Sequence, residues 1–101
     1  MIYVKVEHSS DKLTVEFKGH AGYDEPGKDI VCAGISAIAL LVANVCNELN
    51  GSTDMRDGFA KYIFDEGVQA ERFSGVLLDT LYLMAMRYTD YLTVEEVYNE
   101  G

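Results

Sequence analysis

The sequence has few basic residues and no tryptophan. Eight lysines and arginines stand against seventeen aspartates and glutamates in 101 residues, which gives a formal net charge of −9. Because a field of this sign repels phosphate groups, we expect neither nucleic acid nor an anionic membrane surface as a partner. The charge suits a cationic partner, although net charge also serves simply to keep a small domain in solution.

Cysteine is scarce as well. Cys32 and Cys46 are the only two, and they form neither a short-spaced pair nor a Cys/His cluster. This pattern argues against a structural zinc site and against a secreted disulfide scaffold. We therefore predict a protein that holds no metal and no other cofactor.

The chain also lacks a recognisable targeting segment. Its first residues alternate in character, without the basic start and continuous apolar stretch of a signal peptide. The longest apolar run, from Ile30 to Cys46, is near the lower length limit for a membrane span and contains Ser36 and Asn44. A buried core helix is the better interpretation of this run, and we expect a cytoplasmic protein.

Strand periodicity is clear in several short stretches. Apolar and polar residues alternate in four of them: 2–7, 12–18, 58–65 and 91–98. A short polar turn separates the first two, which predicts a β-hairpin with one apolar face. The stretch 52–57 is mostly polar and predicts a connection.

Two longer segments, 30–49 and 68–88, have helical spacing of apolar residues. No linker or repeat divides the chain, so we predict a single domain over residues 1–101. Its fold class is α+β: two layers, with two helices packed on a small, mainly antiparallel sheet in the order ββαβαβ. Both helices are apolar on more sides than one sheet covers, which favours a homodimer.

Cys32 is the first candidate for chemistry. With Asp29 as N-cap of the first helix, Cys32 takes the third helical position, where unpaired amides and the helix dipole favour a thiolate. The carboxylate of Asp29 opposes this unless it points at the backbone as a cap, the arrangement we expect. The amides here, including that of Cys32, are candidates for an oxyanion hole. A cysteine at this position is still more often a small buried apolar residue.

His20 begins the connection 19–29, which is longer than the usual two to six residues. If the loop ends lie close together, the imidazole can take a proton from Cys32, although a histidine in such a setting is more often a surface residue. Gly19 and Gly22 let the backbone approach a substrate. The hydroxyl of Ser36, one turn after Cys32, can hydrogen-bond to His20 or to the Cys32 thiol. The alternative is a hydrogen bond back to the Cys32 carbonyl.

The other cysteine and the other histidine of the chain show less sign of a functional role. Cys46, far along the same helix, is predicted to lie in the core. His8, near the first turn, is predicted to be exposed to solvent.

The pattern Gly19-His20-Ala21, followed by Asp29-Ile30-Val31-Cys32-Ala33 and Ser36, resembles the ribosomal-processing cysteine protease family, Prp. The resemblance extends in order and spacing over the whole chain. It implies that His20 and Cys32 form a catalytic pair. To the same site we assign Asp29 and Ser36 as supporting residues. The substrate-loop residues that we assign are Gly19, Ala21 and Gly22.

The resemblance also implies a substrate and an assembly. The family removes a short N-terminal extension from a large-subunit ribosomal protein, number twenty-seven, in Firmicutes and related bacteria. A homodimer and a mobile loop at 19–29 are implied as well. Two other hypotheses stay open: a non-catalytic acidic module that binds a basic ribosomal protein, and a redox-sensing thiol, for which Cys46 is too distant to be the resolving partner.

Overall fold

The computed structural model describes residues 1–25 and 28–99. The elements in chain order are β1 (Ile2–Ser9), β2 (Lys12–Gly19), α1 (Ile30–Glu48), β3 (Ser52–Arg56), β4 (Phe59–Asp65), α2 (Val68–Arg87) and β5 (Leu92–Asn99). The predicted loop 19–29 and the predicted domain 1–101 include residues 26–27 and 100–101, which lie outside the described residues.

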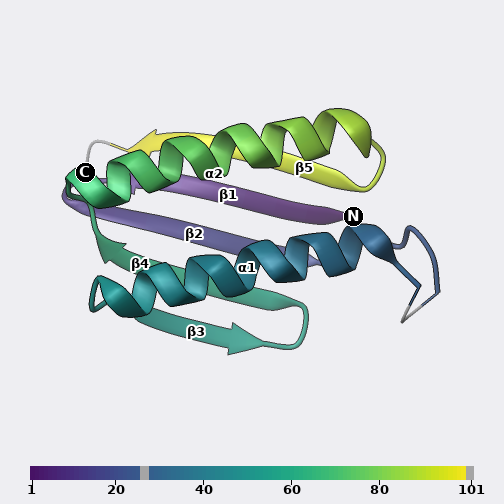
Figure 1. Ribbon diagram of the computed structural model, residues 1–101, viewed down its shortest axis with the longest axis horizontal. Coiled ribbons are helices and arrows are strands. Elements are labelled where there is room, and N and C mark those ends of the chain that lie inside the picture. The colour runs from purple at the N-terminus through teal and green to yellow at the C-terminus, as the bar shows by residue number, and fades with distance from the viewer. Residues whose placement is uncertain (26–27, 100–101) are drawn as a thin grey trace.

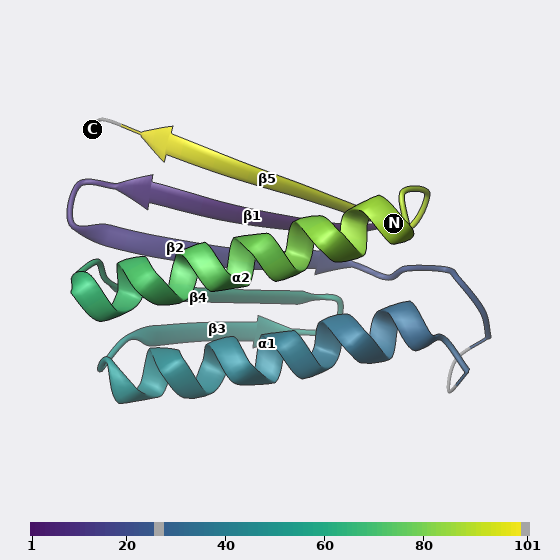
Figure 2. The ribbon, with the colours of Figure 1, turned by 45° about the horizontal axis from the view of Figure 1, so that its top comes forward.

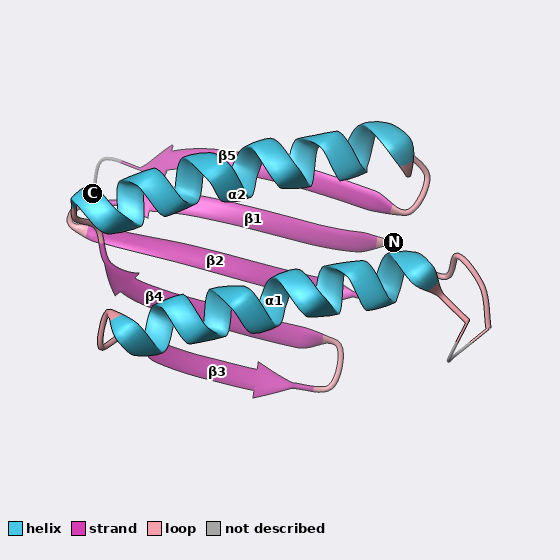
Figure 3. Ribbon diagram, in the orientation of Figure 1, coloured by secondary structure: helices cyan, strands magenta, loops and turns pink. Residues whose placement is uncertain are grey.

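The strands form one sheet in the order β3-β4-β2-β1-β5, and both helices lie on one face of it (Figure 1). The two helices run in opposite directions (Figure 2). Helix α1 covers the β3–β4 side of the sheet and α2 covers the β1–β5 side (Figure 1). Three strand pairs are antiparallel, and β1 with β5 is parallel. This two-layer arrangement (Figure 3) confirms the predicted α+β fold, and the predicted elements follow the ββαβαβ order, with one strand, β3, added between α1 and β4.

One element is missing from the prediction. Ser52–Arg56 forms β3, where the sequence predicts a polar connection. All five residues of this strand are exposed, so it has no buried face and no alternation of apolar and polar residues to mark it. Hydrogen bonding to β4 alone defines it as an edge strand.

The core lies between the sheet and the helices. The inward faces of β1 and β2 alternate as predicted, with Val4, Val6, Leu13 and Val15 almost completely buried. Helix α1 contributes four buried residues and α2 contributes five: Val31, Ile35, Val42 and Cys46, and Ala70, Ser74, Leu77, Leu78 and Leu81. The prediction that Cys46 is a core residue is confirmed.

The opposite faces of both helices remain apolar and exposed. Leu40 and Leu41 of α1 are more than half exposed, and so are Val76, Leu83 and Met86 of α2. By length and composition alone, α1 could also cross a membrane, a test that the core helix of a soluble protein passes as well. One apolar stripe of α1 therefore packs on the sheet, while the described part of the chain leaves another exposed.

Helix α1 ends in a Schellman motif. Asn50 has a left-handed backbone (φ 56°), its amide donates to the Asn47 carbonyl, and the Gly51 amide donates to the Cys46 carbonyl. The Asn50-Gly51 pair directly after the predicted helical segment 30–49 is typical of a helix end, and it ends the helix here, with Asn50 rather than glycine as the left-handed residue.

Candidate active site

Asp29 fixes the start of α1, the helix that carries Cys32. One carboxylate oxygen, Oδ1, accepts a hydrogen bond from the Cys32 amide at 2.9 Å, and Oδ2 accepts one from the Tyr23 amide at 2.9 Å. Asp29 is therefore the predicted N-cap, and it also ties the preceding loop to the helix. The hydrogen bond from Cys32, helped by that from Tyr23, holds the pKa of Asp29 below its ordinary value.

This capping bond overturns one expectation. The amide of Cys32 is predicted to be a candidate oxyanion donor, but in this conformation it already donates to the side chain of Asp29. An N–H group has one proton to donate, so the Cys32 amide is not free to bind a developing oxyanion while Asp29 caps the helix.

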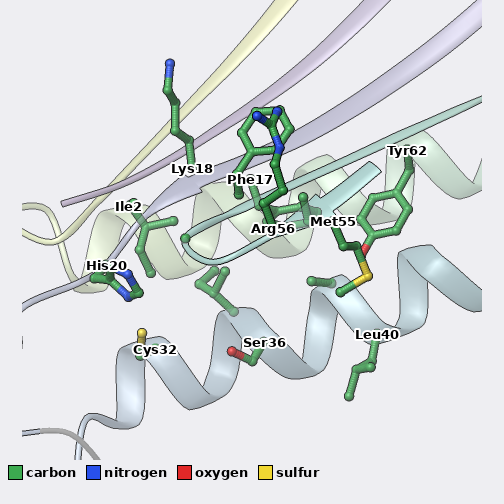
Figure 4. A pocket seen from close by; sticks show the side chains of 16 residues that line it. Ile2, Phe17, Lys18, His20, Cys32, Ser36, Leu40, Met55, Arg56 and Tyr62 are labelled. Carbon is green, nitrogen blue, oxygen red and sulfur yellow. The ribbon is translucent and has the colours of Figure 1, made fainter. Parts of the chain in front are cut away.

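The structure brings His20 and Cys32 together although they are twelve positions apart in sequence. Both side chains line the same groove, and they point toward each other (Figure 4). His20 is exposed and Cys32 is partly buried. Among the described residues, neither side chain makes a hydrogen bond, so the pair is adjacent without being bonded.

Two hollows meet at this pair. One is a groove of about 350 Å³ between α1 and the β3–β4 hairpin, with a mostly apolar lining that includes Leu40, Met55 and Phe59. The other, of about 550 Å³, lies on the loop side and is lined by Gly22, Asp24 and Asp29 among others. Because His20, Cys32 and Ser36 line both, an extended chain that occupies the two hollows passes over the thiol.

Ser36 is placed at the site but is not bonded to it. The residue is exposed, one turn after Cys32, and lines both hollows. Within the described part of the chain its hydroxyl bonds neither to His20 or Cys32 nor back to the helix carbonyls. The predicted supporting bond is therefore not formed in this conformation.

The loop residues have individual reasons for their identity. Gly19 is left-handed (φ 94°), and a Cβ there would lie 2.4 Å from the Met1 carbonyl oxygen. Gly22 is also left-handed (φ 67°) but faces open space. Ala21 is buried (3% exposed).

The Tyr23 ring meets the rings of Tyr88 and Tyr91 edge-on, at centroid distances of 5.7 and 5.0 Å. This aromatic packing anchors the same end of the loop.

The β3–β4 hairpin contributes residues that the sequence prediction missed. Met55, Arg56 and Phe59 line the groove, and Gly58 lies against the His20 ring. The dipeptide Asp57-Gly58 is a turn signal, but a turn signal does not reveal which distant side chain the turn will meet.

The prediction for His8 is wrong. Its ring is largely buried, with Nδ1 2.5 Å from Glu66 Oε1 and Nε2 3.1 Å from Glu96 Oε2, and it stacks on Tyr98. The carboxylates come from the β4–α2 connection and from β5, so this cluster exists only in the assembled sheet. In the described ranges, no group of three or more His, Cys, Asp or Glu side chains could hold a metal ion.

Comparison with known proteins agrees with this geometry. The family model for the cysteine protease Prp matches residues 1–98. A curated relative, the ribosomal processing cysteine protease Prp of Bacillus subtilis (strain 168), is 33% identical over 70% of this chain and 70% of its own length.

Solved structures give the same fold. The essential ribosomal processing protease Prp from S. aureus, in complex with a covalently linked product peptide, matches with a TM-score of 0.81 at 25% identity, over 95% of this chain and 99% of that one. SMU.848 from Streptococcus mutans matches in fold with a TM-score of 0.71 at 23% identity, over 98% and 96% of the two chains. Taken with the match along nearly the whole sequence, these relatives show that this chain belongs to the Prp family of ribosomal-processing cysteine proteases, and the protein is a cysteine protease.

Proposed function

We propose that this protease uses Cys32 as nucleophile and His20 as general base to remove the N-terminal extension of large-subunit ribosomal protein number twenty-seven. The observation that carries the proposal is the position of the His20–Cys32 pair where the two hollows meet. A nucleophile there can reach a peptide bond whose flanking residues occupy both sides.

The reaction follows the usual order for a cysteine nucleophile. His20 accepts the thiol proton, and the Cys32 sulfur attacks the scissile carbonyl carbon to form a tetrahedral intermediate. The C–N bond then breaks, and the His20 imidazolium gives its proton to the leaving amine. Water, activated by His20, hydrolyses the remaining thioester, which releases the new carboxylate and regenerates the thiol.

The substrate assignment rests on two kinds of support. The relatives from B. subtilis and S. aureus are named as ribosomal processing proteases, and the S. aureus protein has been solved with a bound peptide product. The net charge of −9 favours encounter with a strongly basic protein, because opposite charges raise the rate of association. The same charge disfavours direct contact with nucleic acid. The family match counts against a purely non-catalytic acidic module.

The proposal is tested by incubating the extended ribosomal protein with the enzyme and determining the new N-terminus by mass spectrometry. We expect Cys32→Ala and His20→Ala each to lower the cleavage rate about a thousandfold or more. Cys46→Ala is the matched control, since it removes the other thiol from the core, and its folded fraction should cleave at the parent rate. Cleavage by Cys32→Ala at the parent rate would refute the assignment.

We also propose that the protein acts as a homodimer in the cytoplasm, where its free thiols stay reduced. The exposed apolar residues on α1 and α2 support the dimer, because a second copy would cover them. Sedimentation velocity should give a dimer for the parent. Leu83→Glu, which replaces a side chain that is 69% exposed with a charged one, should shift the equilibrium to the monomer. If the parent protein itself sediments as a monomer, the proposal is contradicted.

A further inference from the structure

The β3–β4 turn lies directly against the candidate catalytic histidine. Arg56 pairs with Phe59, so Asp57 and Gly58 alone form the turn. Gly58 has a left-handed backbone (φ 70°). A Cβ built on it would lie 3.1 Å from Nε2 of His20, 3.7 Å from Cδ2 and 3.8 Å from Cε1. Three atoms of the imidazole therefore face the bare α-carbon of this glycine.

A second contact connects the same turn to the strand that carries His20. The carbonyl oxygen of Gly58 accepts a hydrogen bond from the Gly19 amide at 2.8 Å, one residue before His20. The turn thus holds both the backbone leading into His20 and one edge of its ring. On the flank of the turn, the Arg56 guanidinium lies over the Phe59 ring at 4.4 Å and pairs with Asp54 at 3.3 Å.

No hydrogen bond orients the imidazole of His20 in the described part of the chain. A general-base histidine is commonly held by a third polar group, yet no carboxylate, amide or hydroxyl there is hydrogen-bonded to the His20 ring. In place of such a hydrogen bond, Gly58 packs against one edge of the ring. Since His20 is exposed, its ring can rotate away if the turn pushes against it.

We infer that Gly58 is a positioning residue for His20. Because Gly58 has no side chain, the imidazole packs directly against its α-carbon, and this contact sets where the ring lies. The inference rests on the proposed function, because it concerns the base in the His20–Cys32 pair. A Cβ at 3.1 Å is closer than ordinary van der Waals contact, so the ring must move by a few tenths of an ångström. A 1 Å misplacement of a reacting group can lower a rate about a hundredfold, and we expect about a tenfold effect from this smaller shift.

The test compares two substitutions at this glycine with a matched control elsewhere. Gly58→Ala adds the Cβ and strains the left-handed backbone, whereas Gly58→Asn adds the Cβ in a residue that tolerates that backbone. Asn50→Ala, at the far end of α1, imposes a similar left-handed strain (φ 56°) without any contact to His20. Thermal unfolding of all three reports the structural effect separately from catalysis.

We expect both Gly58 variants to lower kcat about tenfold with KM within about twofold of the parent, and Asn50→Ala to keep the parent kcat. A second readout is the rate of Cys32 alkylation by iodoacetamide as a function of pH, followed by mass spectrometry. In both Gly58 variants this profile should move toward that of His20→Ala.

Several results would overturn the inference. Parent-like kcat and alkylation in both Gly58 variants, beside an impaired His20→Ala, would leave the catalytic pair intact and remove Gly58 from it. A higher KM at unchanged kcat would make Gly58 a wall of the substrate groove. Failure of both variants to fold, beside a folded Asn50→Ala, would make it a structural turn residue.

The proposed function fails in a different way. If His20→Ala matches the parent in both cleavage and alkylation, the catalytic pair itself is wrong, and the inference falls with it. If instead the parent does not cleave the ribosomal protein, only the substrate assignment fails, and the alkylation profiles still decide the role of Gly58.

Discussion

Gly51, at the junction between α1 and β3, allows a stability effect to be worked from the structure. A Cβ at this position would lie 2.4 Å from the Ile63 carbonyl oxygen, 2.5 Å from Cys46 Sγ and 2.9 Å from Phe64 Cβ. Ordinary contacts begin near 3.4 Å, so Gly51→Ala requires three neighbours to retreat, and one of them is backbone in a strand. Small-to-large changes in a packed site cost about 1–3 kcal/mol, and we expect the upper end.

Thermal unfolding at fixed protein concentration measures this effect. For a domain of this size, 1 kcal/mol corresponds to about 4–8 °C in Tm. The melting temperature of Gly51→Ala should therefore fall by about 12–24 °C, the shift for 3 kcal/mol. The activity of the folded fraction should change little, because Cys32 lies near the opposite end of α1.

The matched control makes the same chemical change with the opposite expected sign. Gly75 lies in α2 and is exposed, and a Cβ added to it would have no neighbouring atom within 4 Å. Gly75→Ala should raise Tm by about 4–8 °C, since alanine stabilises a helix interior by about 1 kcal/mol relative to glycine. A Gly51→Ala variant that melts within about 2 °C of the parent would refute the steric reasoning.

Three further predictions concern single side chains. Asp29→Asn should unfold in less urea than the parent at pH 7, and the urea midpoints of the two proteins should converge below about pH 4. The pKa of Asp29 is lowered in the folded state, so its carboxylate stabilises the fold above the unfolded pKa and ceases to do so as the pH falls through the folded pKa. A difference that does not depend on pH would contradict this. His8→Phe keeps the stacked ring but removes the partner of two glutamates, so the free energy of unfolding at pH 6 should fall by about 1–3 kcal/mol, and an unchanged urea midpoint would count against the cluster. Tyr23→Ala should speed thermolysin cleavage within 19–29, because it removes the edge-to-face contacts that anchor the loop; an unchanged cleavage rate would show that the anchor lies elsewhere.

Short-range signals in the sequence were sufficient for much of the fold. The hairpin, both helices and the cap at Asp29 follow from alternation, helical spacing and capping chemistry, all of which act over a few residues. The same local reasoning places Cys32 and Ser36 on one face of a helix start. The relation of His20 to Cys32 needed one further step, that the two ends of a loop lie close together.

Other features depend on contacts between distant parts of the chain. Strand β3 exists only because it hydrogen-bonds to β4. The two carboxylates that contact the His8 ring come from β5 and from the β4–α2 connection.

The candidate active site shows the same difference between local features and long-range contacts. Local sequence patterns predict which residues are candidates for the chemistry: a thiol at a helix start and an imidazole before a glycine-rich loop. Their surroundings form only when the chain folds: a groove walled by the β3–β4 hairpin and a glycine against the imidazole ring. Periodicity and capping are local properties of the chain. The contact between Gly58 and His20, in contrast, joins positions separated by the whole of α1 and β3, so it forms only when the sheet assembles.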